Sequence, residues 1–195
     1  DSEIGDLIKF LEKEKVFNNT IIVVTGDHGT NAGNPKRKTS NSSSNLYEMF
    51  GDEYHHVPLI FHGPNIKKSE VTNICSHIDL APTLLNILNI KIPRIFLGKP
   101  VTEKLNEKNN IVIAENTGNG LCDIKRKKIV MSLRTEKIKI VYEIISFNVR
   151  EREVYDLSQD KWGLSNIIKT SRYLKDRKLL MTIAKQRALK LEKES

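Results

Sequence analysis

Hydrophobic residues recur at intervals of three and four positions near the start of the chain, and the polar residues between them fall on the opposite side of a helix. The apolar positions are Ile4, Leu7, Ile8 and Leu11, and their period predicts an amphipathic helix within residues 1–18. An unbroken apolar or β-branched run follows over residues 21–25. A short run bounded by turn residues predicts a buried strand of a parallel sheet. Helix, turn and strand in this order form one unit of an α/β fold.

The predicted strand leads into the turn Gly26-Asp27-His28-Gly29, which places a carboxylate and an imidazole at the end of the strand. Open α/β sheets place their ligand sites beyond the carboxyl ends of their strands. A carboxylate and an imidazole side by side form half of a metal site, and the two glycines let the backbone turn sharply. The alternative interpretation is a polar turn with a surface histidine.

Further elements follow the long polar stretch Thr30–Asn45. Residues 59–61 predict a second buried strand, with Pro58 at its start, where no ladder hydrogen bond is lost. The histidines at 55, 56 and 62 fit no helix face, so we interpret them as loop and strand-end residues. Asp79 and Pro82 predict the start of a helix that continues to residue 88.

Beyond about residue 108 the pattern changes to short segments in which apolar and polar residues alternate. Such alternation is typical of an antiparallel sheet with one buried face. Residues 173–193 then carry one apolar stripe among many charges and predict a long helix. The predicted strands cover residues 111–114, 128–133, 137–142 and 154–157.

Composition agrees with a globular protein but selects no function. The chain has 195 residues, a hydrophobic share of 38% and a formal net charge of +8. No apolar run approaches the roughly 18 residues of a membrane span, and two cysteines make no disulfide framework. The basic clusters lack aromatic interleaving, zinc-finger spacing or a helix-turn-helix pattern, so we expect a solvated basic face and no nucleic acid. A basic approach also suits an anionic ester substrate.

Five segments of the chain form a recognisable series: residues 1–11, residues 19–29, Tyr47-Glu48 with His56–Pro64, Ser76–Leu85 and Glu153–Asn166. They occur in the order in which sulfatases carry similar segments. The last one is similar to that family's late Glu-Leu-Tyr-Asp-Leu…Asp…Asn-Leu segment. The chain therefore resembles the second half of a sulfatase, within the alkaline-phosphatase-like superfamily.

The resemblance implies an α/β fold class: the second half of an alkaline-phosphatase-like mixed sheet flanked by helices, followed by a small C-terminal antiparallel sheet with a long helix. Residues 1–107 would be the C-terminal half of the catalytic α/β domain. Residues 108–195 would be the antiparallel-sheet subdomain with its terminal helix. Since no strand precedes the first helix, we expect the chain to start inside a domain and to be a partial C-terminal fragment.

The resemblance also implies a divalent-cation site to which Asp27 and His28 contribute. Hard oxygen ligands favour Ca²⁺ or Mg²⁺, and an imidazole ligand leaves Mn²⁺ and Zn²⁺ open. His77 is the candidate for the late histidine of the superfamily's two-metal phosphatases, although sulfatases often carry a histidine there without using it as a ligand. Sulfatases usually place a substrate-binding lysine four residues before the Tyr-Glu pair. Ser43 occupies that position here, so Lys38 is the candidate substitute.

The family's nucleophile is a formylglycine made within a Cys/Ser-x-Pro/Ala-x-Arg motif, which lies upstream of the Asp-His pair. Cys122 and Arg126 have the right separation, but Ile124 stands where the motif needs Pro or Ala. We therefore expect an enzyme that hydrolyses sulfate esters in its full-length form, and an inactive fragment.

Two alternatives remain open at this point. Phosphodiesterases and phosphoglycerol or phosphoethanolamine transferases of the same superfamily share the Asp-His pair and use Thr or Ser as nucleophile, which would make the substrate a phosphate ester. The second alternative is a non-catalytic interaction module with a basic surface.

Overall fold

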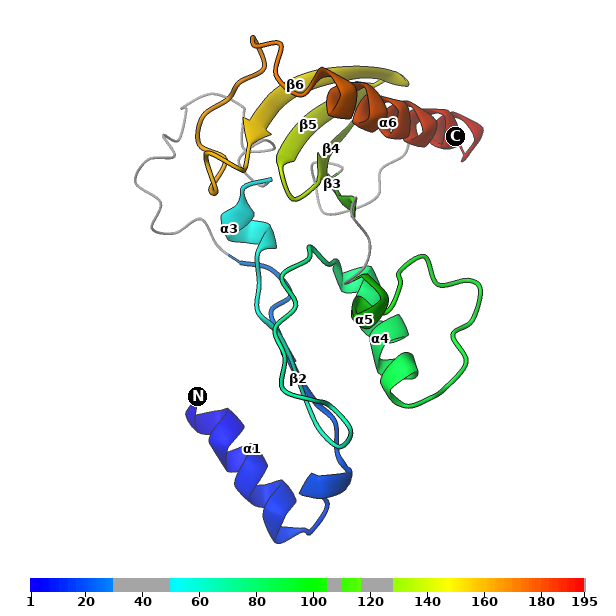
Figure 1. Ribbon diagram of the computed structural model, residues 1–195. Coiled ribbons are helices and arrows are strands. Elements are labelled where there is room, and N and C mark those ends of the chain that lie inside the picture. The colour runs from blue at the N-terminus through cyan, green and yellow to red at the C-terminus, as the bar shows by residue number, and fades with distance from the viewer. Residues whose placement is uncertain (30–49, 105–109, 117–127, 195) are drawn as a thin grey trace.

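The computed structural model describes residues 1–29, 50–104, 110–116 and 128–194. Figure 1 shows helix α1 at one end of the molecule and a four-stranded sheet with helix α6 at the other, with the β1–β2 ribbon between them. The helices and strands are α1 (Ser2–Lys13), η1 (Phe17–Asn19), β1 (Ile22–Thr25), α3 (Asp52–His55), β2 (Leu59–His62), η2 (His77–Asp79), α4 (Leu80–Ile87), α5 (Val101–Lys104), β3 (Val112–Asn116), β4 (Lys128–Arg134), β5 (Ile138–Ile145), β6 (Asn148–Asp156) and α6 (Leu174–Glu194).

Strand β1 confirms the predicted strand, but its surroundings differ from the prediction. Among the described residues β1 pairs with β2, antiparallel, from Ile22 opposite His62 to Thr25 opposite Leu59. Its first three residues are half-buried and Thr25 is exposed. The expected parallel pairing and full burial are therefore wrong for this pair. An apolar run indicates that both faces of a strand suit apolar neighbours, but it does not encode the direction of the next strand.

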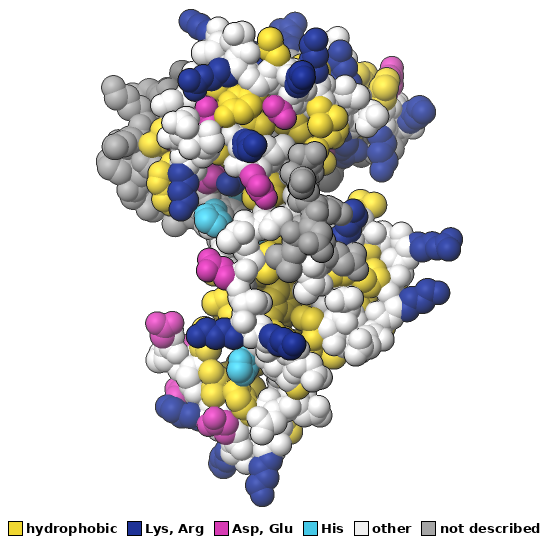
Figure 2. Space-filling view, viewed as in Figure 1, with side chains coloured by type: hydrophobic (Ala, Val, Ile, Leu, Met, Phe, Trp, Pro, Cys, Tyr) yellow, Lys and Arg dark blue, Asp and Glu magenta, His cyan; other side chains and the backbone are white. Residues whose placement is uncertain are grey.

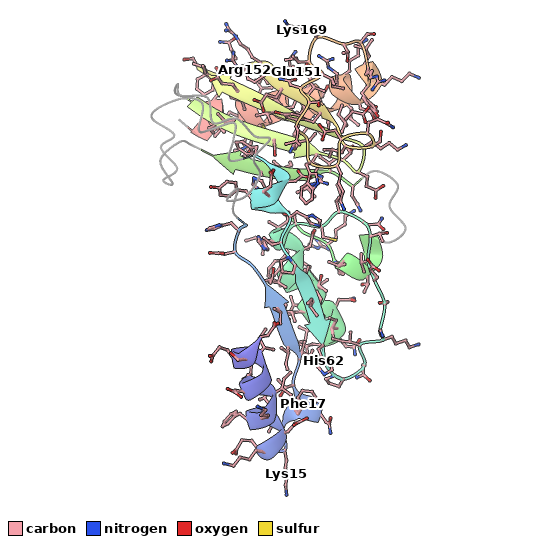
Figure 3. All side chains as sticks on the ribbon, turned by 90° about the vertical axis from the view of Figure 1, so that its left-hand side faces the viewer. Lys15, Phe17, His62, Glu151, Arg152 and Lys169 are labelled. Atoms are coloured by element: carbon pink, nitrogen blue, oxygen red, sulfur yellow. The ribbon has the colours of Figure 1, made fainter. Side chains whose placement is uncertain are left out.

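The short helix η1, which follows α1, is joined to the ribbon by an aromatic contact. Phe17 of η1 stacks on His62 at the end of β2, with ring centroids 5.3 Å apart and an interplanar angle of 28° (Figure 3). Helix α1 itself has the predicted apolar side, yet none of its residues is buried. The stacking places His62 in a structural role, away from the Asp27–His28 turn.

The C-terminal sheet confirms the antiparallel prediction and holds most of the core. Its strands follow the order β3-β4-β5-β6, and α6 contacts the last three. Across the described residues, no helix combines the length and hydrophobicity that a membrane span needs. The core between sheet and helix consists of Ile129, Met131, Leu133, Ile138, Ile140, Tyr142, Ile144, Val154, Leu180, Ala184, Ala188 and Leu191.

The opposite face of the sheet carries a smaller cluster that reaches the N-terminal part of the chain. Phe50, which comes just before α3, is 3% exposed and packs with Val130, Val141, Tyr155 and Leu157. Side chains alternate between the two faces of a strand, so this cluster and the α6 core are formed by neighbouring residues of the same strands. Helix α3 is thereby attached to the sheet.

Polar side chains hold the segment after β6 in its turns. The Asp156 carboxylate accepts hydrogen bonds from the hydroxyl groups of Ser158 (2.6 Å) and Tyr173 (2.8 Å) and pairs with Arg172 (3.1 Å). These contacts, led by the Ser158 hydroxyl, hold the pKa of Asp156 below its usual range. The Asn166 side chain accepts the Val154 amide at 3.1 Å. These polar residues therefore hold the loop against β6.

Lysine and arginine side chains gather over the C-terminal sheet and α6 (Figure 2). Lys175, Lys178 and Lys185 of α6 are exposed, as is Lys169 in the loop before it. The α6 part of the expected basic face is thus exposed to solvent, while the basic clusters at residues 36–38 and 125–127 fall outside the described residues.

Replacing Tyr142 by phenylalanine is expected to leave the free energy of unfolding unchanged or slightly higher. The Tyr142 side chain is fully buried, and its hydroxyl has no hydrogen-bond partner within the described part of the chain. Removing an unsatisfied buried hydroxyl costs little, because no bond is lost. The matched control is Tyr155→Phe, since the Tyr155 hydroxyl donates to Glu153 at 2.7 Å. Urea unfolding should show that Tyr155→Phe lowers the free energy of unfolding by roughly 1–3 kcal/mol and that Tyr142→Phe does not lower it.

Alkaline pH provides a second test of Tyr142. Burial, with the nearby Glu151 carboxylate adding to it, raises the pKa of the Tyr142 phenol above its ordinary value of 10.0. The folded state therefore keeps a proton that the unfolded state loses, so this contribution to stability is complete below about pH 10 and falls as the pH rises further. Wild type should lose stability between about pH 9 and about pH 11 more steeply than Tyr142→Phe. Equal slopes would contradict the assignment.

Candidate metal site

The Asp27–His28 turn lies at the carboxyl end of β1, where the sequence predicts it. Both side chains face solvent, with exposed fractions of 89% for Asp27 and 69% for His28. Asp27 Oδ1 accepts the backbone N–H of His28 at 2.8 Å. This hydrogen bond, with the imidazoles of His28 and His77 adding to it, holds the pKa of the Asp27 carboxyl below its usual range. Asp27 is therefore an ionised oxygen donor at neutral pH.

The His28 ring is held in one orientation and one tautomer. Its Nδ1 lies 2.7 Å from the carbonyl oxygen of Gly29. A carbonyl oxygen only accepts, so Nδ1 carries a proton, and in the neutral imidazole the lone pair is on Nε2. Nε2 lies 3.8 Å from Asp27 Oδ2. Metal-ligating histidines commonly donate their other ring N–H to a carbonyl or carboxylate in this way.

These two donors fit a shared divalent cation. Ligands about 2.0–2.6 Å from one cation lie within a few ångströms of each other, which the separation of 3.8 Å satisfies. Within the described ranges, no group of three or more His, Cys, Asp or Glu side chains converges on one point. The described residues therefore offer a two-donor portion of a site.

Helix α3 supports the turn from the other side. The Gly29 N–H donates to the Tyr54 carbonyl at 2.8 Å, and the His28 and Tyr54 rings lie 6.3 Å apart. A Cβ at Gly29 would overlap the carbonyl oxygen of Glu53. Glycine is thus required here because two backbone segments touch.

His77 approaches the turn from the loop before α4. Its Nε2 lies 2.9 Å from the Gly26 carbonyl and therefore donates to it. The histidine that the sequence marks as a possible late ligand thus contacts the residue before Asp27 and lies 51 positions away along the chain. Asp79 is the N-cap residue of α4, as the sequence predicts, but its side chain makes no cap hydrogen bond to that helix. It accepts the Ser76 N–H at 2.8 Å in a capping box of η2.

A cavity of about 290 Å³ opens beside the turn. It combines two carboxylates, three imidazoles and apolar surface, a composition usual for small-molecule sites. Sequence reasoning did not select most of the lining residues, which belong to α3 and β3 or flank them and carry no local motif. The cavity is lined by Asp27, His28, Phe50, Tyr54, His55, Val57, His77 and Glu115.

The other candidates from the sequence are not placed relative to this site. Lys38, Ser43 and Cys122 fall outside the described residues. The Cys75 thiol donates to the Asn73 carbonyl oxygen at 3.3 Å.

Comparison with known proteins identifies the family. The family described as "N-sulphoglucosamine sulphohydrolase, C-terminal" matches residues 47–190, and the Sulfatase family matches residues 1–90. The chain belongs to the sulfatase family of hydrolases. The fold is that of sulfatases: a structure described as a 2-O GAG sulfatase superposes with a TM-score of 0.74 at 23% identity, over 100% of the chain and 42% of that protein.

Two relatives illustrate how much of a sulfatase the chain spans. N-acetylglucosamine-6-O-sulfatase of Bacteroides thetaiotaomicron is 27% identical over 206 residues, which cover 95% of the chain and 33% of that protein. Arylsulfatase K of Homo sapiens is 32% identical over 99 residues, which cover 50% of the chain and 17% of that protein. The chain thus spans about a third of the length of the first relative. A further structure, a complex with the substrate D-glucosamine-2-N,6-O-disulfate, superposes with a TM-score of 0.68 at 22% identity over 98% of the chain and 38% of that protein.

Proposed function

We propose that the protein to which this chain belongs hydrolyses sulfate esters, and that Asp27 and His28 contribute two ligands to its divalent-cation site, with Ca²⁺ as the favoured ion. One observation carries the site: the Gly29 carbonyl fixes the His28 tautomer and leaves Nε2 free, 3.8 Å from Asp27 Oδ2. Membership in the sulfatase family supports the reaction class.

The residues of the turn have separate roles in this proposal. Asp27 supplies an ionised carboxylate, and its pKa lies below the usual range of that group. His28 supplies a neutral nitrogen, which also leaves Mg²⁺, Mn²⁺ and Zn²⁺ as candidate ions. A bound cation of this kind stabilises charge on the oxygens of the ester in the transition state.

The substrate is proposed to be an anionic sulfate ester that enters the cavity beside the turn. The cavity offers aromatic and imidazole rings next to the proposed cation. A relative solved with D-glucosamine-2-N,6-O-disulfate supports a sulfated sugar as the substrate class. Lys38 is proposed as a cationic partner of the sulfate group.

The nucleophile is proposed to be a formylglycine in a part of the protein outside these 195 residues. The chain contains no Cys/Ser-x-Pro/Ala-x-Arg motif. The chain by itself is therefore expected to bind the cation weakly and to hydrolyse nothing.

Replacing Asp27 by asparagine is expected to weaken Ca²⁺ binding by the chain at least about tenfold. The substitution keeps the shape of the side chain and removes the charge. Losing even an outer-shell partner of a metal typically costs roughly 10- to 100-fold in affinity. Isothermal titration with CaCl₂ measures the change.

The matched control is Asp6→Asn, because Asp6 is another exposed carboxylate, paired with Lys9 on α1 at 3.0 Å. It should bind Ca²⁺ as wild type does. If Asp27→Asn and Asp6→Asn bind equally, the proposed site is wrong. Turnover of an aryl sulfate against an aryl phosphate diester, by a protein that also contains the upstream half of the family's domain, separates sulfatase from phosphodiesterase activity.

A further inference from the structure

The C-terminal sheet reaches the Asp27–His28 turn through a buried charge cluster. We propose that Lys139 and Arg134 are positioning residues of the cation site, acting through Asp52 and helix α3. The inference rests on the proposed cation site, and it assigns to the C-terminal sheet a role in binding.

The cluster centres on the carboxylate of Asp52, the first residue of α3. Oδ1 accepts from Lys139 Nζ at 3.0 Å, and Oδ2 accepts from Arg134 Nη1 at 2.7 Å. The side chains of Lys139 and Asp52 are 3% and 5% exposed. Each carboxylate oxygen thus has its own charged donor, a geometry that fixes the direction of α3.

The two cations also depend on Asp52. Arg134 and Lys139 are directly opposite one another in the β4–β5 register. Like charges in such a cross-strand pair repel. The shared carboxylate between them offsets this repulsion, so the sheet and α3 stabilise each other's charges.

Aromatic packing also holds helix α3 against the sheet. Phe50 is buried in the sheet cluster and stacks on His55, the last residue of α3, with ring centroids 5.8 Å apart. Lys139 also lies over the Tyr155 ring, 5.1 Å from its centroid. Both ends of α3 are therefore held against the sheet.

Helix α3 in turn holds the metal-ligand turn. Tyr54, two residues after Asp52, accepts the Gly29 N–H at 2.8 Å, and the Glu53 carbonyl lies against the Gly29 Cα. The next residue back along the chain is His28, whose ring is fixed by the Gly29 carbonyl. A displacement of α3 would therefore move the free Nε2 of His28 relative to Asp27.

Positioning can be separated from stability by changing both charges together. Removing one partner leaves a buried charge uncompensated, whereas replacing a buried pair by uncharged groups of similar volume is often neutral for folding. The double variant Asp52→Asn/Lys139→Met removes one anion and the fully buried cation, so the net charge of the cluster is unchanged, and the remaining cation, Arg134, has a side chain that is 25% exposed and can reach water. It should fold, and it should lose the fixed direction of α3.

The test combines CaCl₂ titration of the 195-residue chain with hydrogen exchange of the Gly29 amide. For the double variant we expect about tenfold weaker Ca²⁺ binding and faster Gly29 exchange, with Trp162 fluorescence still reporting a folded sheet. Lys139→Met alone, in which Asp52 keeps Arg134, provides the same readouts should the double variant fail to fold.

The matched control is Arg177→Met. It breaks another largely buried ion pair, in which Arg177 lies 2.6 Å from Glu151. Glu151 is the register partner of Tyr142, on the face of the sheet that packs against α6. It should lose stability and keep Ca²⁺ affinity and Gly29 exchange. Wild-type affinity and exchange in a folded double variant would overturn the positioning role. If wild type itself does not bind Ca²⁺, the proposed function fails, and Gly29 exchange still decides whether the cluster positions the turn.

Discussion

Replacing Leu180 by alanine is expected to lower the free energy of unfolding by about 2–5 kcal/mol. Leu180 is fully buried where α6 packs on the sheet. Truncation removes the transfer free energy of the side chain and leaves a cavity in a closely packed layer. Urea unfolding followed by Trp162 fluorescence measures the loss.

Leu179→Ala is the matched control, because it makes the same chemical change at the adjacent position of the same helix. Leu179 is 53% exposed. The free energy of unfolding of the Leu179→Ala variant should fall by no more than about 0.5–1 kcal/mol. Equal losses for the two variants would mean that α6 packs on the sheet by another face.

Replacing Gly29 by alanine is expected to reduce Ca²⁺ affinity at least about tenfold while leaving the C-terminal core intact. The new methyl group would overlap the Glu53 carbonyl oxygen, so the turn and α3 must separate. Separation breaks the bond between the Gly29 N–H and Tyr54, and it displaces both proposed ligands. The size of the effect is that of losing an outer-shell support of a metal site. CaCl₂ titration measures it.

The neighbouring glycine of the same turn provides the control. A Cβ at Gly26 would lie 3.3 Å from Val57 Cγ1, the end of a side chain that can adjust. Gly26→Ala should therefore change Ca²⁺ affinity less than about threefold, in keeping with a small adjustment. A Gly26 variant as defective as the Gly29 variant would indicate general fragility of the turn.

Features that depend on neighbours in sequence could be predicted from the sequence. The periods of α1 and α6 follow directly from which side of a helix is apolar, and the alternation in the C-terminal segments follows from one buried sheet face. The candidate metal pair is local as well, because the group that fixes the His28 tautomer is the carbonyl of the next residue.

Features that depend on distant segments could not be predicted. The direction of β2 relative to β1 belongs to a pairing between segments that are distant in sequence, and no side-chain pattern records it. The link between Asp52 and Lys139 joins residues 87 positions apart. A lone lysine in a strand pattern gives no sign of a buried partner. The cavity walls contributed by Tyr54 and Glu115 depend on tertiary packing in the same way.

The proposed division into residues 1–107 and 108–195 stays a prediction. The contacts of Phe50 and Asp52 with the C-terminal sheet show that, wherever the boundary lies, the two parts share buried apolar and charged surface.

The β1–β2 ribbon has one further consequence, which concerns populations of conformations. A two-stranded sheet without fully buried residues is marginally stable in water. A site at the end of the ribbon is formed only in molecules whose two strands are paired. The apparent affinity of the site is therefore its intrinsic affinity multiplied by the fraction of such molecules. If that fraction were about one tenth, binding would weaken about tenfold with the ligands unchanged. Any contact that covers the apolar side of α1 or the ribbon would then strengthen cation binding from a distance.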